Sequence, residues 1–534
     1  MESKQLTFRG MVIGIIGSVI ITCSSMFIAL KLSSLPWPIM FVALFSMVCL
    51  KALGNTNLNE INVTHTAMSA GAMVAGGMAF TIPGIYILNP NADISIWQLL
   101  IIALGGTVLG LIFTALIRKY FIETEELPYA MGQAAAELLV IGDQGGKRAS
   151  LLFSSFGVAG IFALLRDWFM KIPATWFSKS MMKYGSIGGF YISPMLVAIG
   201  YIVGPLYIGV WFLGAIIGDV GILIGGQSAG LWDMQQANDI KQSLGLGMMV
   251  GTGVGILIKG ILPKAKQIFG SMFSKEQLGD SVISMRWAPI AMAALALVFT
   301  TVCKMGITAS IIVIIGAWLT TAMSSQCVGQ SGINPMEIFG IIVLLAARAV
   351  TNLNPEAALF VAAIVAVASG LTGDVMNDFK AGYMLKSNPR AQWIGEVIGG
   401  ITGAVVSVVV LALMIKAYGG NSFNDGTFAA AQSHAVAAMI AGISNMPVFW
   451  GGLIIAAGLY CLNLPVMTLG LGIYLPFYLS ATAFIGGALR FVAEKFFPGF
   501  EKESKGQIIA SGVLGGEGVV GVVIALIIAG KSLF

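Results

Sequence analysis

The stretch GLTGDVMNDFKAGYMLKSNPRAQWIGEVIGG, residues 370–400, gathers charge in a chain that has very little, and long apolar runs flank it on both sides. Gly373 is placed to end the preceding apolar helix, Asp374 to cap a new one, and Pro389 to stop that helix before the next apolar run. The pattern predicts a short polar helix at a membrane surface or cavity, with a solvated cytoplasmic loop as the alternative. The charged residues of the stretch are Asp374, Asp378, Lys380, Lys386, Arg390 and Glu396.

The composition is that of a protein built for a lipid bilayer. Hydrophobic residues make up 57% of the 534 positions and charged residues only 10%, whereas soluble domains are about 25% charged. The net charge of +5 is scattered through loops and forms no basic patch with interleaved aromatic residues, which argues against a nucleic-acid partner. Five isolated cysteines and two histidines indicate neither a disulfide framework, nor a metal site, nor a cofactor.

Several apolar runs reach the roughly 18 residues that a membrane-spanning helix needs. We expect an all-α polytopic membrane protein with about 16 transmembrane helices and with re-entrant or broken half-helices. Lys4 and Arg9, before the first run, predict a cytoplasmic N-terminus. Residues 128–142 are short and polar for an ordinary span, so we predict a half-helix there that either crosses or re-enters the membrane.

Segments of similar sequence recur in the two halves of the chain. GGFYISP at 188–194 resembles GIYLP at 472–476, and SLGLGMMVGTGVGILI at 243–258 resembles SGVLGGEGVVGVVIAL at 511–526. These pairs predict two repeated halves, residues 1–275 and 280–534, joined by a charged connection. Transporters built from such repeats bind substrate near the middle of the bilayer, at discontinuous helices between the repeats.

Ionisable side chains inside apolar spans are costly, so they mark candidate functional sites. Glu517 lies near the middle of the last span, where Gly515, Gly516 and Gly518 predict a broken helix that lines a cavity. There Glu517 either takes up and releases protons or makes a structural hydrogen bond to another helix. Asp219 lies within a span in the same way but has no neighbouring motif. Our candidates for proton coupling are Glu517, Asp219, Asp374 and Asp378.

Polar and aromatic residues near helix breaks are candidates for a substrate-binding wall. Tyr129, Gln133 and Glu137 recur every four residues and so share one helix face, which fits a polar lining or an amphipathic surface helix. Asn334 precedes Pro335, where freed backbone carbonyls could bind an amine or a cation, or where a helix simply begins. Tyr191 and Tyr474 complete our substrate-binding candidates. They occupy matching places in the proposed repeats, where they either form walls of a substrate cavity or lie in an aromatic belt at the membrane interface.

The string GDVMNDFKAGYMLKSNPRAQ within residues 370–400 resembles the signature of the oligopeptide transporter (OPT) family, which includes the yellow stripe-like branch. Further matches are spread over the chain, so the resemblance covers essentially all of it. Its short loops resemble those of prokaryotic members and imply a multi-pass protein of the bacterial or archaeal cytoplasmic (cell) membrane. The further matches are LPYAMGQAAAELL (127–139), SGINPMEIFG (331–340), GIYLPFYLSATAFIGG (472–487) and SGVLGGEGVVGV (511–522).

The resemblance implies a proton-coupled symporter that imports small peptides or complexes of metals with amino-acid-derived chelators. The implied partners are the substrate, protons and the lipid bilayer, and copies of the chain could associate as a homo-oligomer. The sequence contains no HExxH or Walker A motif, which argues against metalloprotease and nucleotide-driven chemistry. Two alternatives stay open: a membrane-embedded enzyme that uses Asp374 and Asp378, which lie four residues apart on one helix face, and a passive channel.

Overall fold

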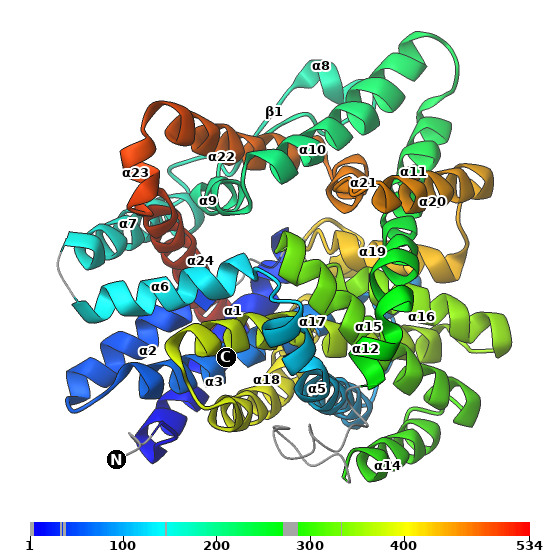
Figure 1. Cartoon of the computed structure of the whole chain (residues 1–534). Coiled ribbons are helices and arrows are strands. Elements are labelled where there is room, and N and C mark those ends of the chain that lie inside the picture. Colours follow the sequence, from blue (N-terminus) through cyan, green and yellow to red (C-terminus); the bar gives the residue numbers. More distant parts are fainter. Residues whose placement is uncertain are drawn as a thin grey trace. The chain divides into compact units, whose positions relative to one another are not determined.

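The computed structural model describes residues 5–32, 35, 39–144, 147–270, 287–332 and 334–533. This part of the chain is predominantly helical (Figure 1), which confirms the all-α prediction. Its one sheet is a hairpin in which β1 (Thr175–Phe177) pairs antiparallel with β2 (Gly189–Tyr191). Among the described residues, nine helices are long and apolar enough to cross a membrane. The total of 16 spans therefore stays a prediction.

The chain divides into two compact units that interleave along the sequence. Unit 1 comprises Met1–Gln144, Gly260–Ala441 and Ala525–Phe534, and unit 2 comprises Gly145–Lys259 and Gly442–Ile524. Each unit takes residues from both predicted halves, and the boundary at 275–280 lies outside the described residues. The division into repeats at 1–275 and 280–534 accordingly remains a prediction.

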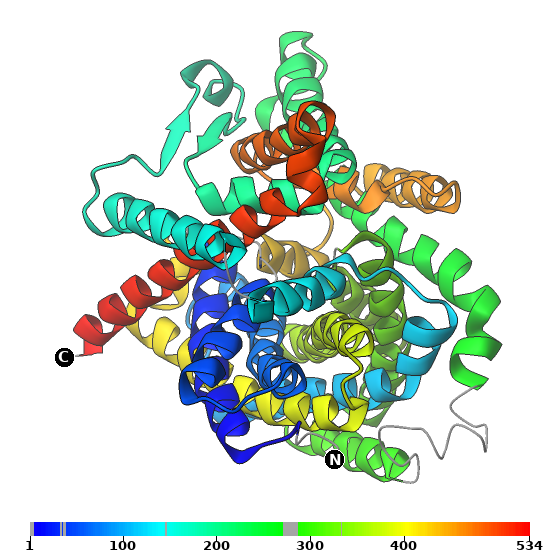
Figure 2. The same ribbon diagram turned by 60° about the vertical axis from the view of Figure 1, so that its left-hand side comes forward.

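Unit 1 is built around one long helix, α17 (Pro355–Leu385), whose apolar stretch is completely buried. In Figures 1 and 2, α17 is yellow-green and has neighbouring helices on several sides. The helices with the largest contacts to α17 are α3 (Leu58–Ala79), α5 (Ile96–Lys119), α6 (Ala130–Gln144), α15 (Ile307–Ser331), α16 (Met336–Val350) and α18 (Pro389–Tyr418). The other helices of this unit include α1 (Phe8–Leu32), α2 (Ile39–Leu53), α4 (Pro83–Leu88), α14 (Ala288–Thr301) and α19 (Ala431–Ala441).

The prediction of a short polar helix after Gly373 is wrong. The α17 helix runs unbroken through Gly373 and Asp374, from an N-cap at Asn354 to a left-handed C-cap at Lys386. One glycine costs a helix only about 1 kcal/mol, and the surrounding helices fix the backbone here. Pro389 behaves as expected, because it opens the next helix behind the capping side chain of Asn388.

Unit 2 consists of shorter helices with irregular stretches between them. Neighbouring pairs are α9 with α22, α10 with α21, and α11 with α20 and α21. The segments η2 and η3 of this unit are π-helical, a wider winding that often marks functional sites, and a further π-helical segment, η4 (Ile256–Ile261), begins in this unit. The elements are α7 (Lys147–Ala163), η2 (Leu164–Trp168), α8 (Lys179–Met182), α9 (Pro194–Val203), α10 (Pro205–Ala215), η3 (Ile216–Gly226), α11 (Met234–Gly255), α20 (Met446–Cys461), α21 (Val466–Tyr474), α22 (Phe477–Phe496), α23 (Pro498–Lys502) and most of α24 (Lys505–Leu533).

The expected break in the last span at Glu517 is also absent, since α24 is one continuous helix. The glycines before Glu517 serve close packing instead. A Cβ on Gly516 would lie 2.1 Å from the carbonyl oxygen of Phe156 in α7, and one on Gly512 would lie 2.0 Å from the Ser155 hydroxyl. Only glycine lets the two backbones approach so closely.

Candidate functional site

Three carboxylates meet in the interior of unit 1. Asp374 and Asp378 lie one turn apart on α17, and Glu396 joins them from α18. All three side chains are fully buried, and one oxygen atom from each lies within 4.8 Å of the others. This spacing suits groups that share protons, and a metal ion could also bridge it. We call Asp374, Asp378 and Glu396 the carboxylate cluster.

The helix α3 adds two buried polar side chains to the carboxylate cluster. The His65 Nε2 atom lies 3.2 Å from Asp378 Oδ1, and the Ser69 hydroxyl donates a 2.5 Å hydrogen bond to Asp378 Oδ2. Neither ring nitrogen of His65 has a hydrogen-bond partner of good geometry, and both oxygens of Asp374 and of Glu396 lack one as well. No lysine or arginine is paired with the carboxylate cluster among the described residues.

A row of glycines brings Glu396 to this position. Gly395, Gly399 and Gly403 recur every four residues on α18 and face α3. A Cβ on Gly399 would lie 2.1 Å from the carbonyl oxygen of Ala67, and one on Gly403 would lie 2.2 Å from the Cα of Gly71. The small-xxx-small pattern therefore sets a very short distance between α18 and α3.

Two of the motifs singled out in the sequence contact α17 near the carboxylate cluster. The backbone N–H of Gly132, in the LPYAMGQAAAELL segment, donates to the side chain of Asn377 at 3.0 Å. Asn334, in SGINPMEIFG, donates from Nδ2 to the carbonyl oxygens of Ser369 and Gly370 at 3.0 and 3.1 Å. The amide of Asn334 is thus engaged in holding α17, and its proposed contact with substrate remains a prediction.

The three residues predicted to share one polar face lie in different surroundings. Tyr129 precedes α6, is fully buried and donates from its hydroxyl to the carbonyl oxygen of Ser325 at 3.0 Å. Gln133 is half-buried, and Glu137 is exposed. Since Tyr129 has a left-handed backbone with φ 45°, it stands outside the helix that carries the other two.

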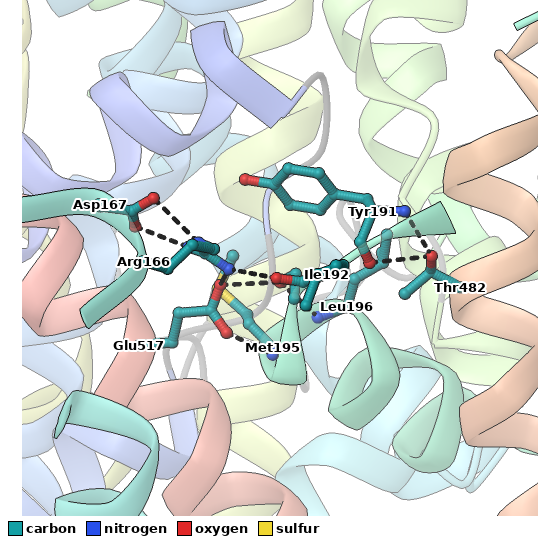
Figure 3. Close-up of polar contacts among 9 residues, drawn as sticks. Arg166, Asp167, Tyr191, Ile192, Met195, Leu196, Thr482 and Glu517 are labelled. Atoms are coloured by element: carbon teal, nitrogen blue, oxygen red, sulfur yellow. Dashed lines mark hydrogen bonds and ion pairs between the residues drawn. The ribbon is translucent and has the colours of Figure 1, made fainter. Parts of the chain in front are cut away.

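In unit 2 the predicted carboxylate Glu517 forms a buried ion pair with Arg166 of η2 (Figure 3), at 2.7 Å from Nη1 to Oε1. The side chains are each 3% exposed. Ser193 donates to Glu517 Oε1 at 2.8 Å, and the backbone N–H of Met195 donates to Oε2 at 2.7 Å. Arg166 also binds the carboxylate of Asp167 through Nε and Nη2. Glu517 is therefore held as a charge-paired acceptor at the start of α9.

The two tyrosines predicted to line a cavity have different neighbours in unit 2. The ring of Tyr191 on β2 lies under the guanidinium of Arg166, 5.4 Å from its carbon, and 6.4 Å from the ring of Tyr478. Tyr474 ends α21 and packs on α11, where a Cβ on Gly245 would lie 2.9 Å from the Cβ of Tyr474. Tyr191 thus lies beside the ion pair of Arg166 and Glu517. Tyr478, which was not selected from the sequence, is its aromatic neighbour.

Asp219, the other predicted carboxylate of unit 2, also has a cationic partner. It lies on the π-helical η3, fully buried, and pairs with Lys241 Nζ at 2.7 Å. The Ser186 hydroxyl donates to its other oxygen at 2.7 Å. Lys241 is itself buried on α11, in the turn before its glycine-rich part.

The four predicted proton-coupling carboxylates therefore fall into two classes. Glu517 is paired with an arginine and Asp219 with a lysine, so each carboxylate has a cationic partner inside the protein. Asp374 and Asp378 have a third acid, Glu396, beside them, and among the described residues the one basic group paired with them is His65. Because unpaired charges are very costly in a protein interior, the carboxylate cluster is expected to be neutralised by protons or by a bound cation.

Sequence reasoning selected Asp374 and Asp378 but missed how the site is completed. The signal for Glu396 was present, since it follows Gly395 in a row of glycines spaced by four and so faces a helix interface. Arg166 and Lys241 lay near the ends of apolar runs, where a charge is ordinarily solvated. No local pattern links either residue to the acid it pairs with.

Comparison with known proteins agrees with this architecture. The family model "OPT oligopeptide transporter protein" matches residues 5–528. A putative oligopeptide transporter of Haemophilus influenzae is 23% identical over 91% of this chain and 90% of its own length. A probable metal-nicotianamine transporter of Arabidopsis thaliana is 30% identical, but over only 29% of this chain and 24% of its own length. A probable metal-nicotianamine transporter of Oryza sativa subsp. japonica is 27% identical over a similar share.

The match of the family model over nearly the whole chain, the helical fold and the buried charges in apolar helices all point to the same assignment. They describe a multi-pass membrane transporter and not an enzyme. The chain belongs to the OPT family of oligopeptide transporters.

Proposed function

We propose that this chain is a proton-coupled symporter that imports small peptides, or metals bound to amino-acid-derived chelators, across the cell membrane. Oligopeptides are the first substrates to test, because the relative aligned over 90% of its length carries that name. The metal-nicotianamine relatives support the chelates through a much shorter match.

The observation that carries the proton-coupled mechanism is the carboxylate cluster. Asp374, Asp378 and Glu396 are buried on membrane-spanning helices without a lysine or arginine partner among the described residues. Protons can neutralise such buried carboxylates without a further ligand. Taking up or releasing a proton then changes the charge at the place where α17 and α18 meet α3. The carboxylate cluster then carries the coupling proton, and the buried ion pairs of Glu517 and Asp219 stabilise the fold of unit 2.

Uptake into proteoliposomes tests this function. An inward proton gradient should drive accumulation of labelled tripeptides, tetrapeptides or a metal–chelate complex above the external concentration. The Asp374→Asn/Asp378→Asn protein should lose gradient-driven accumulation, whereas Asp93→Asn, which changes an exposed carboxylate between α4 and α5, should keep it. Exchange of internal for external substrate serves as the control for folding and binding.

Three results would contradict the proposal. Accumulation by the double variant that still follows the proton gradient would place the coupling elsewhere. Uptake that requires an added divalent cation and ignores the proton gradient would make the carboxylate cluster a metal site. Downhill leakage without any accumulation by the unmodified protein would favour the passive channel.

A further inference from the structure

A row of buried polar atoms without partners continues from the carboxylate cluster along α3. The side chains of Asn62, Thr66 and Ser69 follow each other at four and three residues, so they share one face of the helix. All three are fully buried, and Asn62 Oδ1 and Thr66 Oγ1 have no hydrogen-bond partner. Ser69 is the residue that donates to Asp378.

The facing helix α18 contributes to the same row. Gln392 lies one turn before Glu396, is fully buried and donates from Nε2 to the backbone carbonyl oxygen of Asp378 at 2.8 Å. Its Oε1 atom has no partner. The unpartnered atoms therefore come from both sides of the α3–α18 contact.

The row reaches the surface where α17 ends and α18 begins. Asn62 Nδ2 donates to the hydroxyl of Ser387 at 3.1 Å, and that hydroxyl donates to Oδ1 of Asn59 at 2.7 Å. Ser387 is buried and Asn59 is half-buried, while the next residue of the turn, Asn388, is exposed. From Asn59 to Ser69 the path follows ten residues of helix, about 15 Å.

Toward its C-terminal end, the α3 helix carries no polar side chain between residues 70 and 77. After Ser69 it continues as AGAMVAGG (residues 70–77), in which every side chain is apolar and buried. At the open end of α3, Glu60 is paired with Arg9, whose guanidinium donates to both of its carboxylate oxygens at 2.7 Å. Along α3 the row therefore opens at its Asn59 end, on the side of unit 1 where Arg9 lies in the first helix.

Buried polar atoms in native proteins almost always bind protein groups or ordered water, and a bound water typically makes about three hydrogen bonds. We infer that a water-filled passage lined by Asn62, Thr66 and Gln392 connects the carboxylate cluster with the surface at Ser387 and Asn59. That the passage conducts the coupling proton rests on the proposed function. Since Lys4 and Arg9 predict a cytoplasmic N-terminus, the passage releases that proton to the cytoplasm.

Cysteine labelling tests the passage without measuring transport. In a protein whose five native cysteines are replaced by serine or alanine, single cysteines are introduced as Asn62→Cys, Thr66→Cys and Ala70→Cys. Membrane vesicles of both orientations are treated with a small, charged, membrane-impermeant methanethiosulfonate, and the labelled fraction is read by mass. Ala70 is the matched control, because it is equally buried on the same helix beyond the row.

We expect reagent added on the cytoplasmic face to label Asn62→Cys and Thr66→Cys at least tenfold faster than Ala70→Cys. Equal, slow labelling of all three cysteines would show that no passage exists. Labelling of Asn62→Cys only from the external face would overturn the assigned direction. If the passage labels as expected while wild-type uptake ignores the proton gradient, the passage stands and the proposed coupling fails.

Discussion

The ion pair between Arg166 and Glu517 gives the sharpest test of what a buried carboxylate does in this chain. The two readings of Glu517, proton carrier or structural acceptor, predict different results for Glu517→Gln and Arg166→Gln. The structure favours the structural role, because Glu517 accepts three hydrogen bonds and one of them comes from Arg166. We therefore expect both substitutions to lower stability, and Arg166→Gln to lower it more.

The magnitudes follow from the contacts. In Glu517→Gln one oxygen still accepts from Arg166 and Ser193, but the new amide NH₂ faces the N–H of Met195, which donates at 2.7 Å in the native protein. Losing a hydrogen bond to a charged group costs about 1.5–3 kcal/mol. In Arg166→Gln the carboxylates of Glu517 and Asp167 both lose their cation, and breaking a buried pair costs about 3–5 kcal/mol.

Reversible unfolding in mixed micelles measures these free energies, and exchange of internal for external substrate measures whether the folded fraction binds. The double variant Arg166→Gln/Glu517→Gln should be more stable than Arg166→Gln alone, because it removes the unpaired charge of Glu517 together with its partner. If Glu517→Gln instead unfolds like wild type, keeps exchange and loses gradient-driven accumulation, then Glu517 carries the proton and our reasoning from the ion pair is wrong.

Three further predictions concern the other contacts. Gly399→Leu should push α18 from Ala67, cost about 1–3 kcal/mol in unfolding free energy and abolish coupled uptake, whereas Gly451→Leu, at an open position of unit 2, should change neither. Lys241→Met should cost about 3–5 kcal/mol by leaving Asp219 unpaired, and adding Asp219→Leu should recover part of that loss; equal stability of both proteins would refute the buried pair. Coupled uptake should move one proton per substrate, read from the membrane potential at which net flux reverses; a ratio of two would contradict the cluster as a single-proton carrier.

The sequence was sufficient for the class of fold and for part of the site. Apolar runs predict helices reliably because a bilayer leaves the backbone few alternatives. Asp374 and Asp378 could be placed on one helix face from their spacing alone. The family signature drew attention to the helix that proves to be the centre of unit 1.

What the sequence could not supply is long-range packing. Gly373 and Asp374 carry the local signals of a helix break, yet α17 continues because neighbouring helices enclose it on the way to Lys386. The partners of the acids are equally remote in sequence: Arg166 and Glu517 are 351 residues apart. Such pairs follow from the tertiary fold, and no short pattern encodes them.

The energetics of the carboxylate cluster limit how it can work. With a neutral His65, three ionised acids would place a charge of −3 in the interior, and three protons shared among the four groups restore neutrality. Releasing one proton leaves one charge, which His65 and Ser69 are placed to share. Releasing a second adds repulsion between two carboxylates within 4.8 Å of each other, at least about 3.5 kcal/mol at an effective dielectric constant of 20. A second release is therefore unfavourable in this geometry, and the cluster exchanges one proton at a time.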